Sequence, residues 1–429
     1  MRVPIPEPGP SSSLARHPDF LRLWSAETVS QLGSQVSALA LPFVAIDILR
    51  ATTFEVALLN VVDFLPFLLV GLPAGVWVDR LRLRPILIAG DLGRAAALAS
   101  IPLAFALGVL TVLQLYVVGF VVGVLTVFFD VAYQSYLPSL VGRDQLVEGN
   151  SKLEVSRSGA QVVGPGVAGI LIDRIGAPFA VVVDAVSFVA SAAFVLTIRR
   201  REPPPERGTD PTGNRTGMRA EIGEGLRYVL RHRYLRAIAA CTGTANLFGT
   251  IGGSILLVYV VRELGMEAAS VGIAFSIGSL GALLGALSAN AIARRLGVGP
   301  TIVVFSAISG PALMPLALVP AGTSIAALVA LLAVAGFVLG LATVVYNVNQ
   351  VSLRQAITPE RMQGRMNATM RWIVWGTIPI GGLLGGLLGT AIGLRTTILL
   401  AAIGESLVFL PVLLSEVRSI REMPAAAEA

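Results

Sequence analysis

The sequence has very few residues of the kinds that metal and redox chemistry require. Cys241 is the only cysteine among 429 residues, so no intrachain disulfide can form, and His17 and His232 lie apart in polar stretches. Without a cluster of His and Cys, no transition-metal site is expected. Lys152 is the single lysine, and its surroundings, GNSKLE, lack the glycine-rich spacing of a phosphate-binding loop. We therefore expect no ATPase, no other enzymatic activity, no metal and no cofactor.

Charge is also scarce. Charged residues make up 14% of the chain and hydrophobic residues 55%, whereas about 25% of the residues in soluble proteins are charged. The mean hydropathy of +0.78 agrees with this composition. The first twenty residues are rich in Pro and Ser, without an apolar core or a cleavage site, so we expect a soluble tail and no signal peptide. The composition predicts an all-α polytopic membrane protein.

Twelve apolar stretches are each long enough to cross about 30 Å of hydrocarbon as a helix. They cover residues 22–48, 54–78, 85–108, 111–134, 153–173, 177–198, 236–262, 269–292, 300–320, 323–348, 367–391 and 393–415. The pattern predicts two halves of six helices each. The expected division is an N-terminal tail at 1–20, a first half at 21–198, a linker at 199–235, a second half at 236–415 and a C-terminal tail at 416–429.

The linker is rich in Pro, Arg and Glu, and we expect it to be flexible before a short amphipathic helix around 218–235. The basic residues predict the orientation. If both termini lie on one side, only Arg50, Arg174, Arg262 and Arg395 of the 32 Lys and Arg residues fall on the other. The positive-inside rule then makes the side of the termini cytoplasmic.

A charged ten-residue joint, GVWVDRLRLR, lies between two apolar stretches at residues 75–84. Four ionised groups cannot lie in lipid, so the joint must be a turn at a water interface. A shift of 214 residues aligns it with ANAIARRLGVGP, in which Ala293 stands at the position of Asp79. A shift of 216 residues aligns 139–151 with 355–367. These echoes predict two halves related as a parallel repeat.

A resemblance to a known family rests on this joint and on the segments FLRLWSAETVSQLGSQVSALALPFVA, YLPSLVGRDQLVEGNS, VVGPGVAG and PERMQGRMNATMRWIVWGTIPIGGLLGG. Together they resemble the major facilitator superfamily, and most closely its branch of macrolide efflux proteins and enterobactin exporters. The resemblance covers nearly the whole chain and implies twelve transmembrane helices in two pseudo-symmetric halves. It also implies a cytoplasmic gating motif formed by Gly75, Asp79, Arg80 and Arg84, with Asp130 as the expected partner of Arg80 or Arg84.

Glycines at four-residue spacing recur in the second, eighth and eleventh stretches, and the fifth is also glycine-rich. Small residues allow helices to approach closely in lipid, and in the superfamily these four helices line the seam between the halves. The segment SGAQVVGPGVAGI is similar to the antiporter motif of exporters, which implies roles for Gly159, Gly164, Pro165 and Gly169. Ordinary small-residue packing, which importers would share, is the alternative.

Carboxylates inside the apolar stretches are functional candidates because an unpaired one is costly in lipid. Asp91 and Arg94 lie one turn apart and are expected to neutralise each other. Glu27 and Asp63 have no basic residue within helical reach, and these two, with Asp184 as a weaker candidate, are the predicted proton carriers. Alternatively, each points into a water-filled cavity and only hydrates it. Glu405, on the last helix, is the weakest candidate.

The expected cavity is apolar with sparse polar groups. Its candidate lining residues are Phe43, Phe67, Asn246, Tyr259, Tyr346, Asn347 and Trp375. We therefore predict a monomeric secondary transporter of the inner membrane that exports a bulky amphipathic compound, such as a drug, macrolide or siderophore, in exchange for protons. An importer or facilitator on the same fold is the alternative, followed by a membrane receptor or scaffold. No nucleic-acid partner is expected.

Overall fold

The computed structural model describes residues 14–78, 81–141, 145–199, 218–320 and 322–422. These described residues form helices and contain no strand. A first bundle contains α1 (Pro18–Phe43), α2 (Thr53–Leu69), α3 (Gly71–Val78), α4 (Leu83–Ala106), α5 (Val112–Val141), α6 (Leu146–Ile175) and α7 (Ala177–Thr197). The π-helical turn η2 (Val44–Ile48) continues α1.

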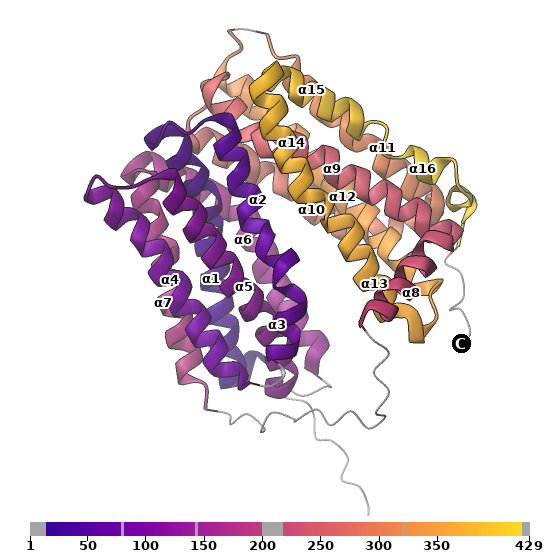
Figure 1. Ribbon diagram of the computed structural model, residues 1–429, viewed down its shortest axis with the longest axis horizontal. Coiled ribbons are helices and arrows are strands. Elements are labelled where there is room, and N and C mark those ends of the chain that lie inside the picture. The colour runs from indigo at the N-terminus through magenta and orange to yellow at the C-terminus, as the bar shows by residue number, and fades with distance from the viewer. Residues whose placement is uncertain (1–13, 79–80, 142–144, 200–217, 321, 423–429) are drawn as a thin grey trace, which may run out of the picture.

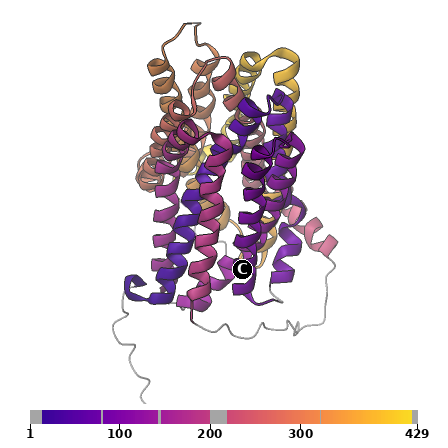
Figure 2. The same ribbon diagram turned by 90° about the vertical axis from the view of Figure 1, so that its left-hand side faces the viewer.

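A second bundle follows, beside the first (Figure 1). It contains α9 (Arg233–Arg262), α10 (Ala268–Leu296), α11 (Val298–Ala317), α12 (Ile325–Ala356), α13 (Glu360–Trp375), α14 (Thr377–Ile392), α15 (Leu394–Glu405) and α16 (Leu410–Leu413). The amphipathic helix α8 (Met218–Arg231) packs on α13, where Arg365 Nη1 lies 2.6 Å from Glu224 Oε2. In the view turned by 90°, the long helices run side by side (Figure 2).

Ten helical segments among the described residues are long and apolar enough to cross a membrane. Two more segments lie beside them, which is compatible with the predicted twelve. The first is α2 with α3, whose helix is interrupted at Val70 after only 17 residues. The second is α6, which begins at Leu146, before the predicted apolar stretch, and carries charged side chains in its first half. The all-α polytopic fold is therefore confirmed.

The repeat is visible in the backbone between neighbouring helices. Gly176 separates α6 from α7 with φ 84° and ψ 148°, and Gly393 separates α14 from α15 with φ 87° and ψ 155°. Positive φ at such a joint favours glycine, which has no Cβ to clash with the backbone. The fifth and sixth spans and the eleventh and twelfth are thus joined by the same local turn.

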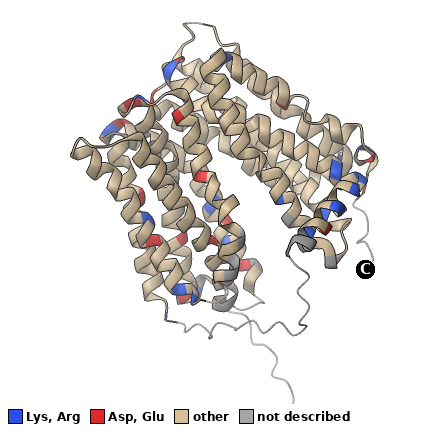
Figure 3. Cartoon of the chain, viewed as in Figure 1, with Lys and Arg blue, Asp and Glu red and all other residues tan. Residues whose placement is uncertain are grey.

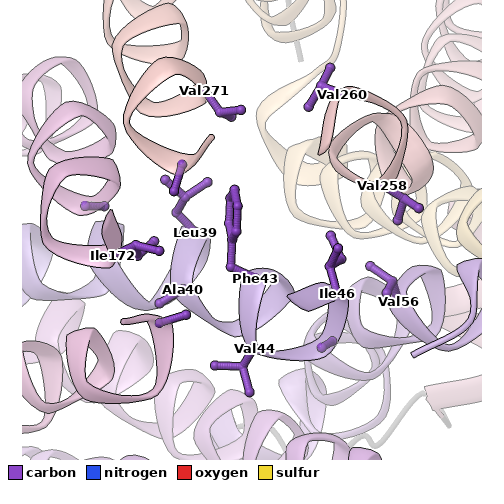
Figure 4. Packing of buried hydrophobic residues seen from close by; sticks show 14 of the residues in the cluster. Leu39, Ala40, Phe43, Val44, Ile46, Val56, Ile172, Val258, Val260 and Val271 are labelled. Carbon is purple, nitrogen blue, oxygen red and sulfur yellow. The ribbon is translucent and has the colours of Figure 1, made fainter. Parts of the chain in front are cut away.

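The two bundles share a hydrophobic cluster at one end of the molecule. Figure 4 shows Phe43, Ile46 and Val56 of the first bundle near Val258 and Val260 of the second. Two other clusters lie at the opposite end, and each of them contains residues of a single bundle. In Figure 1 the bundles meet near α2 and α14, whereas α3 and α13 lie farther apart. The molecule is closed at the first end.

Glycines allow the backbones of the two bundles to touch along two helix pairs, α6 with α10 and α2 with α14. A Cβ added to Gly272 of α10 would contact the carbonyl oxygen of Pro165 in α6. A Cβ added to Gly386 of α14 would lie 2.9 Å from Ala57 Cβ and 3.1 Å from Phe54 Cδ2 of α2. Because lipid gives little drive for apolar burial, this close packing stabilises the contact between the bundles.

Hydrogen bonds also hold the two bundles together at the closed end. The Arg262 guanidinium donates to the carbonyl oxygen of Ala51 at 2.5 Å and more weakly to that of Ile46 at 3.4 Å. Across the pair of α6 and α10, Asp173 Oδ2 accepts a hydrogen bond from the backbone N–H of Ala269 at 3.1 Å. Ala269 lies in the first turn of α10, so Asp173 of one bundle caps a helix of the other.

Candidate functional site

A large cavity of about 850 Å³ lies inside the first bundle and is lined by α1, α2, α4, α5, α6 and α7. Its lining includes five carboxylates and two guanidinium groups. These are Glu27, Asp63, Asp130, Glu154 and Asp184, with Arg94 and Arg157. Figure 3 shows charged residues along the helices of this bundle, whereas charges in the second bundle gather mainly at helix ends. Acidic groups therefore outnumber basic ones in the cavity.

One face of α1 supplies several polar groups of the cavity. Glu27, Gln31 and Ser34 follow at spacings of four and three residues, which places them on the same side of a helix. The Gln31 amide donates from Nε2 to Glu27 Oε1 at 2.7 Å. Glu27 is half-buried and has this neutral partner, so its negative charge is oriented but not balanced by the hydrogen bond.

Asp184 of α7 lines the cavity beside this face of α1. Its Oδ1 accepts hydrogen bonds from Ser187 Oγ at 3.2 Å and from Ser34 Oγ at 3.5 Å. A Cβ added to Gly33 would lie 2.7 Å from Asp184 Oδ1, so the glycine makes this close approach possible. Asp184 is only 2% exposed and is held by neutral donors.

Asp63 of α2 has a different environment. Its side chain is exposed to the cavity and, among the described residues, makes no hydrogen bond or ion pair. A Cβ on Gly119 of α5 would meet the Asp63 carboxylate, and one on Gly123 would lie 2.8 Å from Pro66 Cγ. Glycines of α5 thus give α2 room at this level. Asp63 is therefore accessible to a small ligand entering the cavity.

Arg94 is the buried positive charge of the cavity wall. Its Nη2 lies 2.5 Å from Asp91 Oδ1, which confirms the pair predicted from their spacing. The guanidinium carbon also lies 4.3 Å from the ring centre of Phe129 and 4.1 Å from that of Phe188. Cation–π contacts with both rings and the ion pair with Asp91 hold Arg94 in place.

Only some of the predicted gating residues lie among the described residues. Asp79 and Arg80 lie outside the described residues, and Gly75 lies in α3. Arg84, in the first turn of α4, donates to the carbonyl oxygens of Val195 at 3.2 Å and Leu196 at 2.6 Å. Asp130 of α5 is exposed to the cavity. The contacts of Arg84 therefore join the ends of two helices within the first bundle.

The residues of the antiporter-like motif all lie on α6. A Cβ on Gly164 would contact Gln35 of α1, and one on Gly169 would contact the carbonyl oxygen of Ala268 in the second bundle. Gly159 has open space around it, and Pro165 lies inside the helix. These contacts are those of close helix packing, and the exporter-specific role stays a prediction.

The seven predicted cavity residues fall into four groups, of which Trp375 alone is the fourth. Phe67 lines the large cavity, and Asn246, Tyr346 and Asn347 line a second cavity of about 220 Å³ in the second bundle. Phe43 and Tyr259 are buried in the hydrophobic cluster at the closed end, where the Tyr259 hydroxyl donates to the carbonyl oxygen of Leu316 at 2.9 Å.

Trp375 lies between the bundles. Its ring centre is 5.8 Å from that of Phe64 in an edge-on arrangement, and the Arg371 guanidinium lies 4.5 Å from it. Phe64 belongs to α2 and Trp375 to α13, so an aromatic contact links the two bundles.

Two charged residues of the large cavity were not predicted: Glu154 and Arg157, which line it from the first half of α6. Glu405 of α15, the weakest of the predicted carboxylates, lines the second cavity. Glu154 and Arg157 both fall inside the predicted stretch 153–173, but the prediction treated this stretch as apolar. A signal for Glu154 and Arg157 was available in their three-residue spacing, which places both on one helical face.

Known proteins resemble this chain over nearly its whole length. The family described as transmembrane secretion effector matches residues 11–429. The multidrug efflux pump Tap of Mycolicibacterium fortuitum is 27% identical, with 92% of this chain and 96% of the pump covered. The enterobactin exporter EntS of Salmonella choleraesuis is 24% identical, with 97% of each covered.

The fold also has solved counterparts. The crystal structure of a bacterial homologue of the iron transporter ferroportin in an inward-facing state superposes with a TM-score of 0.71 at 18% identity. The match covers 94% of this chain and 99% of that one.

Proposed function

The chain belongs to the transmembrane secretion effector family of the major facilitator superfamily, and from this premise we propose that it exports a bulky amphipathic compound by proton antiport. The chain is a multi-pass membrane transporter by family. The observation that carries the proposal is the large cavity, in which five carboxylates face two guanidinium groups. Such a surplus of acidic groups favours protons and cargo with a positively charged group.

Export is coupled to proton entry because protons and cargo compete for the same carboxylates. A carboxylate in a low-dielectric site must be neutralised, either by a proton or by a cationic group of the cargo. Asp63 has no partner among the described residues, and Glu27 has only a neutral one, so both are available for this exchange. A proton that enters on Asp63 or Glu27 weakens the hold on the cargo, and its release restores that hold.

Asp184 is a weaker carrier in this scheme. Its hydrogen bonds from Ser34 and Ser187 stabilise the charged form without a proton. Arg94 is already paired with Asp91 and enclosed by two aromatic rings. We propose that Arg94 holds the cavity wall in place while Asp63 and Glu27 exchange protons.

Alternating access requires that the two ends of the molecule open in turn, and in this structure one end is closed while the bundles lie farther apart at the other. In the described state the hydrophobic cluster and the Arg262 and Asp173 contacts close one end. We propose that this is the outer end and that both termini are cytoplasmic. We also propose that the protein is a monomer in the inner membrane. The halves would comprise residues 21–198 and 236–415, joined by the linker at 199–235. At the inner end, Asp79 would act as a latch when that side closes.

Transport into everted membrane vesicles tests the proposal. The vesicles receive an inside-acid pH gradient, and uptake of ethidium, a lipophilic cation, is followed by fluorescence. Uptake that depends on the gradient is expected, and uptake by Asp63→Asn and Glu27→Gln vesicles should fall. Glu263→Gln, an exposed residue outside the cavity, is the matched control and should transport normally. If a known exporter works in the same vesicles but wild-type protein accumulates none of several amphipathic cations, the proposal is wrong.

A further inference from the structure

The second bundle repeats one detail of the first at equivalent positions. In the first bundle, Gly33 of α1 allows Asp184 of α7 to approach. In the second, Gly249 of α9 faces Glu405 of α15, and a Cβ added to Gly249 would lie 3.8 and 4.0 Å from the two carboxylate oxygens. Gly33 and Gly249 are 216 residues apart, which is a shift that aligns the two halves. Each bundle thus sets a carboxylate of its sixth span against a glycine of its first.

The two carboxylates also share a helix face. α7 follows Gly176 and α15 follows Gly393, and the two glycines have nearly the same backbone angles. Counted from these glycines, Asp184 is the eighth residue and Glu405 the twelfth. Four residues make about one helical turn, so Glu405 points in the same direction one turn farther along.

The second bundle has no counterpart of Arg94. Its third span, α11, contains no charged residue, and a Cβ added to Gly310 of α11 would already contact the backbone N and the side chain of Ser406. α11 and α15 are too close at this point for an arginine. The described lining of the second cavity contains no Lys, Arg or His. Among the residues that the structure describes, Glu405 therefore has no lining cation to balance its charge.

The carboxylate is buried and incompletely bonded. Glu405 is 6% exposed, and its Oε2 has no hydrogen-bond partner among the described residues. α15 ends at Glu405, and a turn follows in which the Leu407 N–H bonds the carbonyl oxygen of Gly404 at 3.0 Å before α16 begins. Interrupted helices beside a buried charge are a recurrent arrangement at ion sites in membrane transporters.

We propose that the second cavity is a binding site for a monovalent cation, a proton or a sodium ion, held by Glu405. Its volume of about 220 Å³ is below the 300–1,000 Å³ of most drug-sized sites but ample for a small cation with water. Neutral oxygens around it come from Thr242, Ser306, Ser309 and Tyr346. The site goes beyond the exchange proposed for the first bundle and needs no cargo.

The titratable groups that face Glu405 are few. α9 contributes Cys241 and α12 contributes Tyr346, while α11 and α14, which also pack near α15, contain no titratable side chain. A thiol and a phenol are both neutral near pH 7, so a change in charge at this site has to come from Glu405 itself.

Purified full-length protein in nanodiscs, without cargo, tests the site in two arms. The first follows the infrared band of protonated carboxyl groups during a pH step without sodium. The second measures equilibrium binding of radioactive sodium ions at alkaline pH. We expect Glu405→Gln to lose the part of the carboxyl band that wild-type protein shows, or to bind sodium at least tenfold more weakly. The first result identifies a proton as the ligand and the second a sodium ion.

Control variants separate the outcomes. Glu405→Asp retains the carboxylate and should retain cation binding with altered affinity, which guards against a folding defect in Glu405→Gln. Glu263→Gln should match wild type in both arms. The Glu27→Gln, Asp63→Asn double variant should keep the signal of Glu405 even though transport is lost, so failure of the exchange in the first bundle is distinguishable. If Glu405→Gln matches wild type in both arms, the second cavity is not a cation site.

Discussion

The two bundles share one fold but differ in where they hold charge. The large cavity of the first bundle has five carboxylates and two arginines, whereas the second cavity has a single carboxylate among neutral groups. In the third span of the first bundle Arg94 pairs with Asp91, whereas in the third span of the second bundle Gly310 allows α11 to touch the residue after Glu405. A repeat can therefore keep its helix packing while one copy acquires most of the ionisable chemistry.

The largest effect should come from removing the two proposed proton carriers of the first bundle. With both Glu27→Gln and Asp63→Asn, we expect gradient-driven export to fall to the level of membranes without the protein, because neither proposed carrier remains to exchange a proton for cargo. Export of ethidium from intact cells measures this. Glu405→Gln should reduce export less, and equal losses from both variants would break the proposed contrast between the bundles.

Arg94→Gln should have the next largest effect. The change leaves Asp91 buried without a cation and removes the charge between Phe129 and Phe188, so we expect a loss of about 3–5 kcal/mol in the free energy of unfolding. Unfolding in mixed detergent micelles, followed by circular dichroism, measures the loss. Arg157→Gln is the matched control, because Arg157 is exposed, and we expect its stability to stay close to that of wild type. Equal stability of both variants would contradict the assigned role.

Glycines of the seam allow a comparison between crowded and open positions. A methyl group on Gly272 would contact the carbonyl oxygen of Pro165 in the other bundle, while Gly253 has nothing within 4 Å of an added Cβ. We expect Gly272→Ala to lower stability by about 1–3 kcal/mol through overpacking and Gly253→Ala to have little effect. Thermal unfolding of the two variants tests this. A stable Gly272→Ala protein with normal transport would show that the interface between the bundles can accommodate an added methyl group.

Asp79→Asn should have a smaller effect. Asp79 belongs to the predicted interfacial joint, and its equivalent in the repeat is Ala293. We expect transport to slow several-fold while cargo binding remains, since a latch affects closure more than affinity. Ligand binding to purified protein, measured beside transport, separates the two. A loss of binding as large as that of Asp63→Asn would exclude the role of a latch.

The smallest predicted effect concerns the closed end. Asp173→Ala removes the cap that α10 receives from the first bundle at Ala269, which costs about 1 kcal/mol. Spin labels at Leu107 and Leu318, both exposed near this end, should report a larger population with a longer distance between the labels. Glu267→Ala is the control because the side chain of this N-cap residue makes no capping bond. Identical distance distributions in both variants would show that the cap is unimportant.

Much of the fold could be predicted from the sequence because lipid imposes simple rules. Long apolar stretches have to be helices, and the spacing of Asp91 and Arg94 had to bring them together. The glycines at four-residue spacing also marked surfaces where helices can touch. The start of α6, before residue 153, was missed because Glu148 and Lys152 made it look like a connection, although the polar face of α6 lines the cavity.

The rest depended on information that no single helix contains. Phe43 and Tyr259 are aromatic residues of apolar stretches, like Phe67, but they belong to the closed contact between the bundles. Which way a side chain faces is set by the rotation of its helix against neighbours from the other half. Glu405 was ranked last because the final helix is usually peripheral, whereas its burial, its place in the second cavity and its contact with Gly249 show that it faces inward.

The bonds of Arg262 and Asp173 across the closed end have a consequence for the resting protein. At about 1 kcal/mol each, two such bonds would favour this shape roughly thirtyfold over one in which both are broken, other contributions being equal. We expect an empty protein to spend most of its time waiting with the α3 and α13 end apart. Cargo and protons then need to bind the other conformation only a few kcal/mol more tightly to shift the protein into it. After they are released, thermal motion can return the protein to the resting conformation.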